Sequence, residues 1–294
     1  MRVLVTGANG QLGKCLQDNA IDKKFSYIFL GKNELDIANF SLTEKVIKDN
    51  APDFIINAAA YTNVEKAEEE KKEAELINNL AVENLAKICK SQQSFLIHIS
   101  TDYIFDGKKN IGYKEADRPS PLNFYGLSKL MGENAIQKVS CSHIILRPSW
   151  IFSEHGSNFL KTMLALGNSH KKLKIINDQF GSPTYGQDLA LTIYKLINTI
   201  SSASSSFSKL FHYSGHKRCS WHTFAKTIFL EAKLSGLSYP EEIEEISSSE
   251  YKSAVIRPEN SYLNCSKINK EFNIEPSNWE IGIKKAIKSL VVLG

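Results

Sequence analysis

Residues 2–13 read Arg-Val-Leu-Val-Thr-Gly-Ala-Asn-Gly-Gln-Leu-Gly, and this stretch decides the fold class of the chain. Its first five residues form a β-branched run, which is typical of a strand buried on both faces of a parallel sheet. Three glycines at G-x-x-G-x-x-G spacing follow directly, so that the backbone can approach a pyrophosphate at the start of a helix. The stretch therefore predicts a dinucleotide-binding turn made of Gly7, Asn9, Gly10, Gln11, Leu12 and Gly13.

The rest of the first half repeats the same rhythm of short apolar runs and longer amphipathic segments. Further strands are predicted at residues 26–30, 54–57, 95–100 and 143–147, and a helix is clearest over 73–90. Strands that alternate with helices indicate an α/β fold with a doubly wound, Rossmann-type parallel sheet. The second half predicts helices over 159–166, 188–198, 221–232 and 281–290, a strand over 173–176, and an exposed serine-rich loop over 201–208.

This rhythm also suggests how the chain divides. We expect a dinucleotide-binding domain over residues 1–150 plus roughly 170–200. A smaller, mostly C-terminal substrate lobe is expected over 151–169 and 201–294.

Composition narrows the class of protein and its compartment. The net charge of the 294 residues is +4 and the basic residues are scattered, which argues against a nucleic-acid partner. No apolar run is long enough for a signal peptide or a bilayer span. The odd number and wide spacing of the cysteines indicate reduced thiols and a cytoplasmic location; they are Cys15, Cys89, Cys141, Cys219 and Cys265.

Two further segments are placed to contact a dinucleotide. After the second predicted strand, Asp36 and Ile37 stand where the adenine half is expected, and the small residues Ala58, Ala59 and Ala60 follow the third strand. Lys32 occupies the place where an NAD-selective site usually carries an acid, and it is equally suited to a 2′-phosphate or to solvent. NADPH is therefore slightly favoured over NADH.

A Tyr-x-x-x-Lys pair and a strand-end threonine suggest carbonyl reduction. Tyr125 and Lys129 share one face of a predicted helix, and a nearby ammonium is expected to lower the pKa of a phenol. Tyr125 would then donate a proton to a carbonyl oxygen as hydride reaches carbon. Thr101 ends the fourth predicted strand, at the edge of the sheet where ligands bind.

These residues together resemble the extended short-chain dehydrogenase/reductase superfamily and, within it, the dTDP-4-dehydrorhamnose reductase family. The resemblance covers nearly the whole chain, and it is most specific in Ser-Thr-Asp-Tyr-Ile-Phe-Asp-Gly (100–107) and Asp-Gln-Phe-Gly-Ser-Pro-Thr (178–184). It implies reduction of a dTDP-linked 4-keto sugar by NADPH or NADH, within dTDP-rhamnose and polysaccharide biosynthesis.

The resemblance also implies roles for single residues. Tyr125 would be the general acid, Lys129 would bind the nicotinamide ribose, and Thr101 would hold the keto group. The residues that it places at the sugar are Asn63, Asp102, Tyr103 and Trp150. A homodimer is compatible with the resemblance. Some members dimerise around a metal, but this sequence displays no ligand cluster and Cys15 stands where a carboxylate might be wanted, so no metal is expected.

Three alternatives remain open at this stage. A nucleotide-sugar dehydratase or epimerase has the same fold, but a dehydratase needs a second acid after the strand-end threonine and Tyr103 stands there. Another 4-ketoreductase differs only in product stereochemistry, which the sequence does not display. A non-catalytic regulatory subunit would have no need of Thr101, Tyr125 and Lys129 together.

Overall fold

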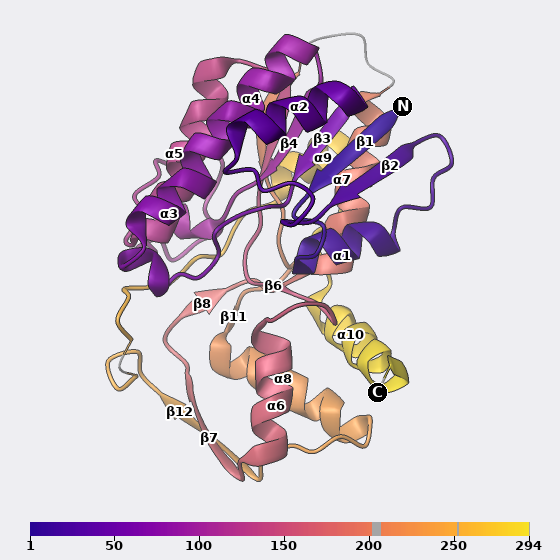
Figure 1. The fold of residues 1–294 in the computed structure, drawn as a ribbon. Coiled ribbons are helices and arrows are strands. Elements are labelled where there is room, and N and C mark those ends of the chain that lie inside the picture. The colour runs from indigo at the N-terminus through magenta and orange to yellow at the C-terminus, as the bar shows by residue number, and fades with distance from the viewer. Residues whose placement is uncertain (202–206, 252, 294) are drawn as a thin grey trace.

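The computed structural model describes residues 1–201, 207–251 and 253–293, which form two lobes (Figure 1). The upper lobe holds a six-stranded parallel sheet of order β10-β5-β4-β3-β1-β2. Its strands are β1 (Arg2–Thr6), β2 (Ser26–Leu30), β3 (Phe54–Asn57), β4 (Phe95–Ile99), β5 (His143–Arg147) and β10 (Ser208–His212). The predicted doubly wound α/β fold is confirmed.

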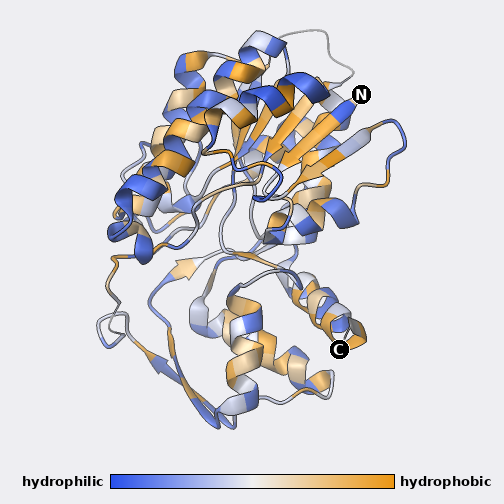
Figure 2. Cartoon of the chain, viewed as in Figure 1, coloured by the Kyte–Doolittle hydropathy of each residue, from blue (hydrophilic) through white to orange (hydrophobic). Residues whose placement is uncertain are grey.

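Helices cover both faces of this sheet because its side chains alternate between two apolar cores. Val3 and Val5 pack with α1 (Gln11–Asp18), α7 (Gly186–Ile200) and α9 (Ser266–Phe272). Leu4 packs on the opposite face with α2 (Phe40–Asn50), α4 (Ala81–Gln92) and α5 (Phe124–Val139). The strands are accordingly apolar along most of their length (Figure 2).

The helix predicted over 73–90 is interrupted by a π-helical turn. It runs as α3 (Lys71–Glu75), the π turn η2 (Leu76–Leu80) and α4. Within the turn, the buried Asn78 accepts from the backbone N–H of Tyr61 and donates to its carbonyl, both at 3.0 Å. The π turn therefore ties the segment after β3 to the helical layer, and Ile77 beside it faces the cleft described below.

The lower lobe has a separate core. Its helices are α6 (Phe159–Ser169), α8 (Trp221–Leu234) and α10 (Trp279–Leu293), which pack around Phe152 and Phe224. The two-stranded sheets pair β7 (Lys172–Ile176) with β12 (Glu242–Ile246), β6 (Ile151–Phe152) with β9 (Thr184–Tyr185), and β8 (Phe180–Gly181) with β11 (Cys219–Ser220). The upper lobe also contains two short 3₁₀ turns. The turn η1 (Lys66–Glu68) comes after β3, and η3 (Asp102–Ile104) comes after β4.

Strands β7 and β10 each belong to the lobe opposite to the one in which their residues were expected. Strand β7 pairs with β12 in the lower lobe, although residues 170–200 were expected in the dinucleotide domain. Strand β10 is the edge of the upper sheet, although residues from 201 onward were expected in the lobe. Of the predicted loop 201–208, residues 202–206 lie outside the described part of the chain and Ser208 begins β10. We propose a division in which β10, α7 and α9 complete the dinucleotide-binding domain.

Two expectations from composition can be compared with the fold. The five cysteines are all free and buried. Among the described residues, no helix combines the length and apolar character that a membrane crossing requires.

Candidate active site

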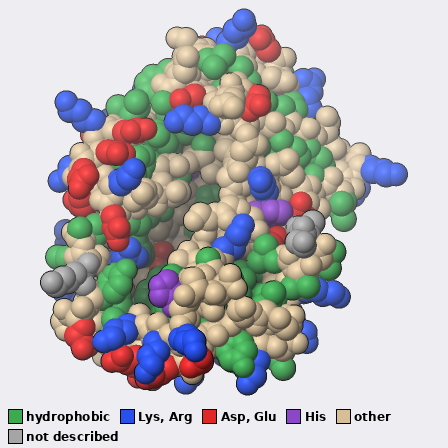
Figure 3. Space-filling view, turned by 60° about the horizontal axis from the view of Figure 1, so that its bottom comes forward, with side chains coloured by type: hydrophobic (Ala, Val, Ile, Leu, Met, Phe, Trp, Pro, Cys, Tyr) green, Lys and Arg blue, Asp and Glu red, His purple; other side chains and the backbone are tan. Residues whose placement is uncertain are grey.

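A cleft of about 860 Å³ runs between the two lobes, at the carboxyl ends of the central strands of the upper sheet. The space-filling view shows a hollow in the surface between the lobes (Figure 3). Its lining comes from the glycine turn, the ends of β2, β3 and β4, the start of α5, and several segments of the lower lobe. An open α/β sheet is expected to bind its ligand at this edge.

The glycine turn has the geometry of a phosphate-binding loop. Gly7 has φ +66°, and a Cβ there would lie 2.6 Å from the backbone N of Ala59, so only glycine fits. Helix α1 begins at Gln11 and has no side-chain cap at Gly10, which leaves its first N–H groups free to bind an anion. Gln11 Oε1 is buried without a hydrogen-bond partner among the described residues, as expected of a group that a ligand satisfies.

Most predicted cofactor-binding residues line the cleft, and one does not. The lining includes Gly7, Asn9, Gly10, Gln11, Leu12, Asp36, Ile37, Ala58, Ala59 and Ala60, together with Lys32. Gly13 lies outside the lining: a Cβ at this position would approach Gly7 O to 2.3 Å, so its role is to let α1 pack against the turn. The third glycine of the motif therefore acts on packing and not on the ligand.

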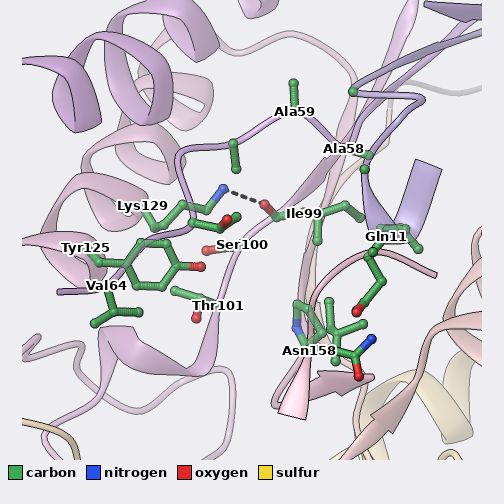
Figure 4. Close-up of a pocket in the computed structure, with 18 of the residues that line it drawn as sticks. Gln11, Ala58, Ala59, Val64, Ile99, Ser100, Thr101, Tyr125, Lys129 and Asn158 are labelled. Atoms are coloured by element: carbon green, nitrogen blue, oxygen red, sulfur yellow. Dashed lines mark hydrogen bonds between the residues drawn. The ribbon is translucent and has the colours of Figure 1, made fainter. Parts of the chain in front are cut away.

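Thr101, Tyr125 and Lys129 meet on one side of the cleft (Figure 4). Tyr125 and Lys129 lie one turn apart on α5, whose first turn is capped by Asn123 through a 2.9 Å hydrogen bond to Gly126 N. Thr101 follows β4, and its hydroxyl is hydrogen-bonded to the Tyr125 side chain. The three candidate catalytic residues thus form one constellation, as the sequence predicted.

The pKa of Tyr125 is opposite in direction to the prediction. Burial raises the pKa of Tyr125, and its interaction with the Thr101 side chain only partly offsets this. Lys129 does not contribute because its Nζ donates to the Ile99 carbonyl at 2.6 Å, away from the phenol (Figure 4). Burial in turn lowers the pKa of Lys129 to about 8. Tyr125 therefore keeps its proton at neutral pH.

The segment after Thr101 is held by polar contacts from both lobes. Asp102 is 3% exposed, accepts from Ser149 Oγ at 2.8 Å and is also hydrogen-bonded to Ser261. Burial raises the pKa of Asp102 to about 6. The Tyr103 ring meets Tyr125 edge-on at 5.8 Å, and both Asp102 and Tyr103 line the cleft. Asp102 therefore orients this segment through the contacts it already makes.

Trp150 and Asn63, both predicted at the sugar, differ in their placement. Trp150 lines the cleft and stacks on Trp221 with ring centroids 3.4 Å apart. Asn63 is absent from the cleft lining; it is exposed and its side chain accepts from Lys66 N at 3.0 Å. Asn63 lies in the loop before η1, outside the cleft lining, whereas its neighbours Thr62 and Val64 line the cleft.

Several lining residues were not predicted as site residues. They include Val64, Ile77, Gly156, Ser157, Asn158, Phe159, Trp221 and Arg257. Arg257 is the most informative because it is a cation from the lower part of the chain that reaches across to the upper lobe. It donates to Tyr103 Oη and to Glu65 Oε1, both at 3.3 Å. Nothing local in the sequence indicates which residues Arg257 approaches.

A buried ion pair lies next to the segments that carry Thr101, Tyr125 and Lys129. Glu133 on α5 accepts from Arg147 on β5 through two hydrogen bonds of 2.9 and 2.6 Å, and both side chains are at most 4% exposed. Ser100, directly before Thr101, also donates to Glu133. Arg147 Nη1 further contacts His212 Nε2 at 3.4 Å, so the pair connects α5, β4, β5 and β10.

A group of three potential metal ligands lies away from the cleft, although the sequence displayed no such cluster. Donor atoms of Asp18, Glu154 and His155 lie within 4.8 Å of one another. They are distant in sequence, which is why no spacing revealed them. His155 contacts Asp18 at 2.6 Å, and Gln187 donates to both carboxylates at 2.8 and 2.6 Å. The group is a hydrogen-bonded network between the lobes, and we assign no metal to it.

The doubly wound sheet, the glycine turn and the Thr-Tyr-Lys constellation define an extended short-chain dehydrogenase/reductase. Residues 1–292 match the family model described as the RmlD substrate binding domain. A dTDP-4-dehydrorhamnose reductase of Sinorhizobium fredii is 38% identical over 100% of this chain and 99% of its own. One of Aggregatibacter actinomycetemcomitans is 39% identical over 96% and 97%. A crystal structure of the Bacillus anthracis reductase in complex with NADP has a TM-score of 0.90 at 35% identity, covering 98% of this chain and 99% of that one. The chain belongs to the dTDP-4-dehydrorhamnose reductase family.

Proposed function

We propose that this chain reduces the 4-keto group of dTDP-4-dehydro-L-rhamnose to dTDP-L-rhamnose with hydride from NADPH. The observation that carries the proposal is the meeting of Thr101, Tyr125 and Lys129 in a cleft that also contains the glycine turn. The relatives named above support the substrate, and the NADP complex of the Bacillus anthracis protein supports the cofactor. The product would feed polysaccharide synthesis, and the free, buried thiols support a cytoplasmic enzyme.

The residues of the upper lobe fit NADPH. The nicotinamide supplies the hydride, and the protein supplies binding, orientation and proton control. The free N–H groups at the start of α1 would bind the pyrophosphate, and Gln11 Oε1 would accept from a donor of the cofactor such as a ribose hydroxyl. Lys32 lines the cleft after β2, where its charge would pair with a 2′-phosphate. We therefore assign NADPH as the preferred cofactor.

The constellation provides the proton chemistry of the reduction. Tyr125 would donate its hydroxyl proton to the oxygen that becomes the 4-hydroxyl, and the raised pKa of Tyr125 keeps this proton available. Thr101 would orient the same oxygen through its hydroxyl. Lys129 would donate to the nicotinamide ribose from its place one turn along α5. Trp150, stacked on Trp221, would contact the deoxysugar with its apolar ring face.

Arg257 would bind the substrate diphosphate, because it is the one cation of the described cleft lining that is neither beside the adenine site nor buried beneath Tyr125. Arg257→Ala is expected to raise KM for the sugar nucleotide roughly 10- to 100-fold, since a charge-assisted hydrogen bond to phosphate would be lost. The KM for NADPH should change little. The control is Arg218→Ala, which removes an arginine that stacks on Phe180 outside the cleft. A rise in the KM for NADPH instead would place Arg257 at the cofactor.

The function is tested by mixing the purified protein with NADPH and dTDP-4-dehydro-L-rhamnose and following absorbance at 340 nm. We expect oxidation of NADPH at a higher kcat/KM than NADH, and NMR of the product should identify dTDP-L-rhamnose. A talose-type product would reassign the stereochemistry and leave the reductase class intact. Tight NADPH binding without turnover of any 4-keto sugar would favour a regulatory subunit.

A further inference from the structure

A row of polar side chains crosses the interior of the upper sheet and ends at Lys129. Thr6, Asn57 and His98 stand at matching register positions on the neighbouring strands β1, β3 and β4. By strand alternation they share the face of Leu4, Ile55 and Leu96, which is the face covered by α4 and α5. All three side chains, and Lys129 beyond them, are at most 1% exposed. The surrounding strand positions are mainly Val, Ile and Leu, which are far less costly to bury.

The hydrogen bonds of this row determine which nitrogen of His98 carries the proton. The Thr6 hydroxyl donates to Asn57 Oδ1 at 2.7 Å, which turns the amide NH₂ group toward His98 Nδ1 at 3.1 Å. An NH₂ group can only donate, so His98 Nδ1 accepts and carries no proton. Burial, with Lys129 beside the ring, holds the pKa of His98 well below its usual range and keeps the imidazole neutral. The ring proton therefore lies on Nε2.

This tautomer acts directly on Lys129, because His98 Nε2 lies 3.5 Å from Lys129 Nζ. An ammonium group has only donors, so in the charged state two N–H groups face each other. Once Lys129 releases one proton, the amine lone pair can accept from Nε2–H while another Nζ–H still donates to Ile99 O. The contact therefore stabilises the neutral amine relative to the ammonium.

The other charged or titratable groups near His98 and Lys129 do not stabilise the neutral amine of Lys129. Glu133 on the same helix raises the pKa of Lys129, but Arg147 pairs with that carboxylate. Tyr125, the other titratable neighbour on α5, keeps its proton because burial raises its pKa. His143 on β5 lowers the pKa of His98.

We propose that His98 is a positioning residue whose Nε2–H, oriented by Thr6 and Asn57, makes the Lys129 ammonium release its proton more readily. Lys129 then changes its charge close to neutral pH, so that the hold of the enzyme on the nicotinamide ribose weakens as pH rises. The proposal rests on the cofactor role assigned to Lys129 under the proposed function. It does not depend on the identity of the sugar.

The first test measures the His98 tautomer in the full-length protein by ¹⁵N NMR of labelled histidine side chains. We expect a neutral ring protonated on Nε2 between pH 6 and pH 9, with the His98 signals identified by their loss in His98→Gln. If that variant does not fold, Thr6→Val serves instead: loss of the hydroxyl frees the Asn57 amide, and one imidazole changes to a mixture of tautomers. A proton on Nδ1, or titration of the ring in this range, would overturn the proposal.

The second test measures NADPH affinity against pH by nicotinamide fluorescence, which needs no sugar substrate. In the wild type, affinity should fall as pH rises through the pKa of Lys129, which is about 8. In His98→Gln the side-chain carbonyl can accept from the ammonium, so the midpoint of the loss of NADPH affinity should shift to a pH about one unit higher. His143→Gln is a matched change at another buried histidine of the sheet, and it should leave the pH midpoint of this affinity loss unchanged. An unchanged or lower midpoint in His98→Gln would contradict the proposal, whereas turnover of a different sugar would affect only the proposed function.

Discussion

Tyr125→Phe is expected to lower kcat by roughly 10²- to 10⁴-fold, the range that a positioned general acid contributes. The change removes one oxygen and keeps the ring, which still packs edge-on against Tyr103. Because Lys129 rather than the phenol holds the cofactor ribose in this proposal, NADPH affinity should stay within a few-fold of the wild type. Stopped-flow measurement of NADPH oxidation together with a binding titration separates the two quantities.

The matched control for this prediction is Tyr27→Phe on β2, since Tyr27 lies outside the cleft lining. It should retain wild-type kcat. Retention of more than about a tenth of the wild-type kcat by Tyr125→Phe would mean that another group donates the proton, because the expected loss is at least ~10²-fold. Asp102 would then be the first alternative, since burial raises its pKa to about 6.

Arg147→Met should destabilise the protein by about 3–5 kcal/mol, because it leaves the Glu133 carboxylate buried with only Ser100 as a partner. The loss would be read as a lower denaturant midpoint in the apo protein, monitored by far-UV circular dichroism. Lys48→Met is the matched control. It breaks the Lys48–Glu44 pair, in which both side chains are about half exposed, and should cost no more than about 0.5 kcal/mol.

A double variant distinguishes the two ways in which Arg147→Met can act. If the cost comes from the unpaired carboxylate, then Glu133→Leu combined with Arg147→Met should recover much of the stability, because apolar residues can replace a buried pair at little cost. A loss below about 1 kcal/mol in Arg147→Met would show that water or His212 compensates for the charge. Lack of recovery in the double variant would instead point to packing.

Much of the upper lobe could be predicted because its signals are local. Each of the first five strands is a short apolar run, and the glycine turn stands directly between a strand and a helix. Strand β10 escaped prediction because Ser208 and Lys209 lead into it from a serine-rich stretch, and an edge strand needs fewer apolar residues. The π turn at Asn78 also escaped, since one extra residue in a turn barely alters helical periodicity.

In the candidate site, too, the residues with local sequence signals were predicted and those that depend on tertiary packing were not. Thr101, Tyr125 and Lys129 were found because a strand end and an i, i+4 spacing are visible locally. Arg257 and Trp221 enter the cleft from the lower lobe, so their approach depends on how distant segments pack. The direction of the Tyr125 pKa was predicted wrongly because spacing alone cannot show that Lys129 Nζ points to Ile99 O. The outward position of Asn63 was not visible in the sequence, because it depends on the loop before η1, where its side chain accepts from Lys66 N.

The position of β10 has a consequence for synthesis on the ribosome. This edge strand pairs with β5 but follows it in the chain only after α6, strands β6 to β9 and α7, the helix that covers the neighbouring face. At ~5–20 residues per second, the nascent sheet waits several seconds with the β5 edge unpaired. Exposed strand edges promote association between chains. Until His212 emerges, the growing chain therefore exposes this strand edge to association with other chains.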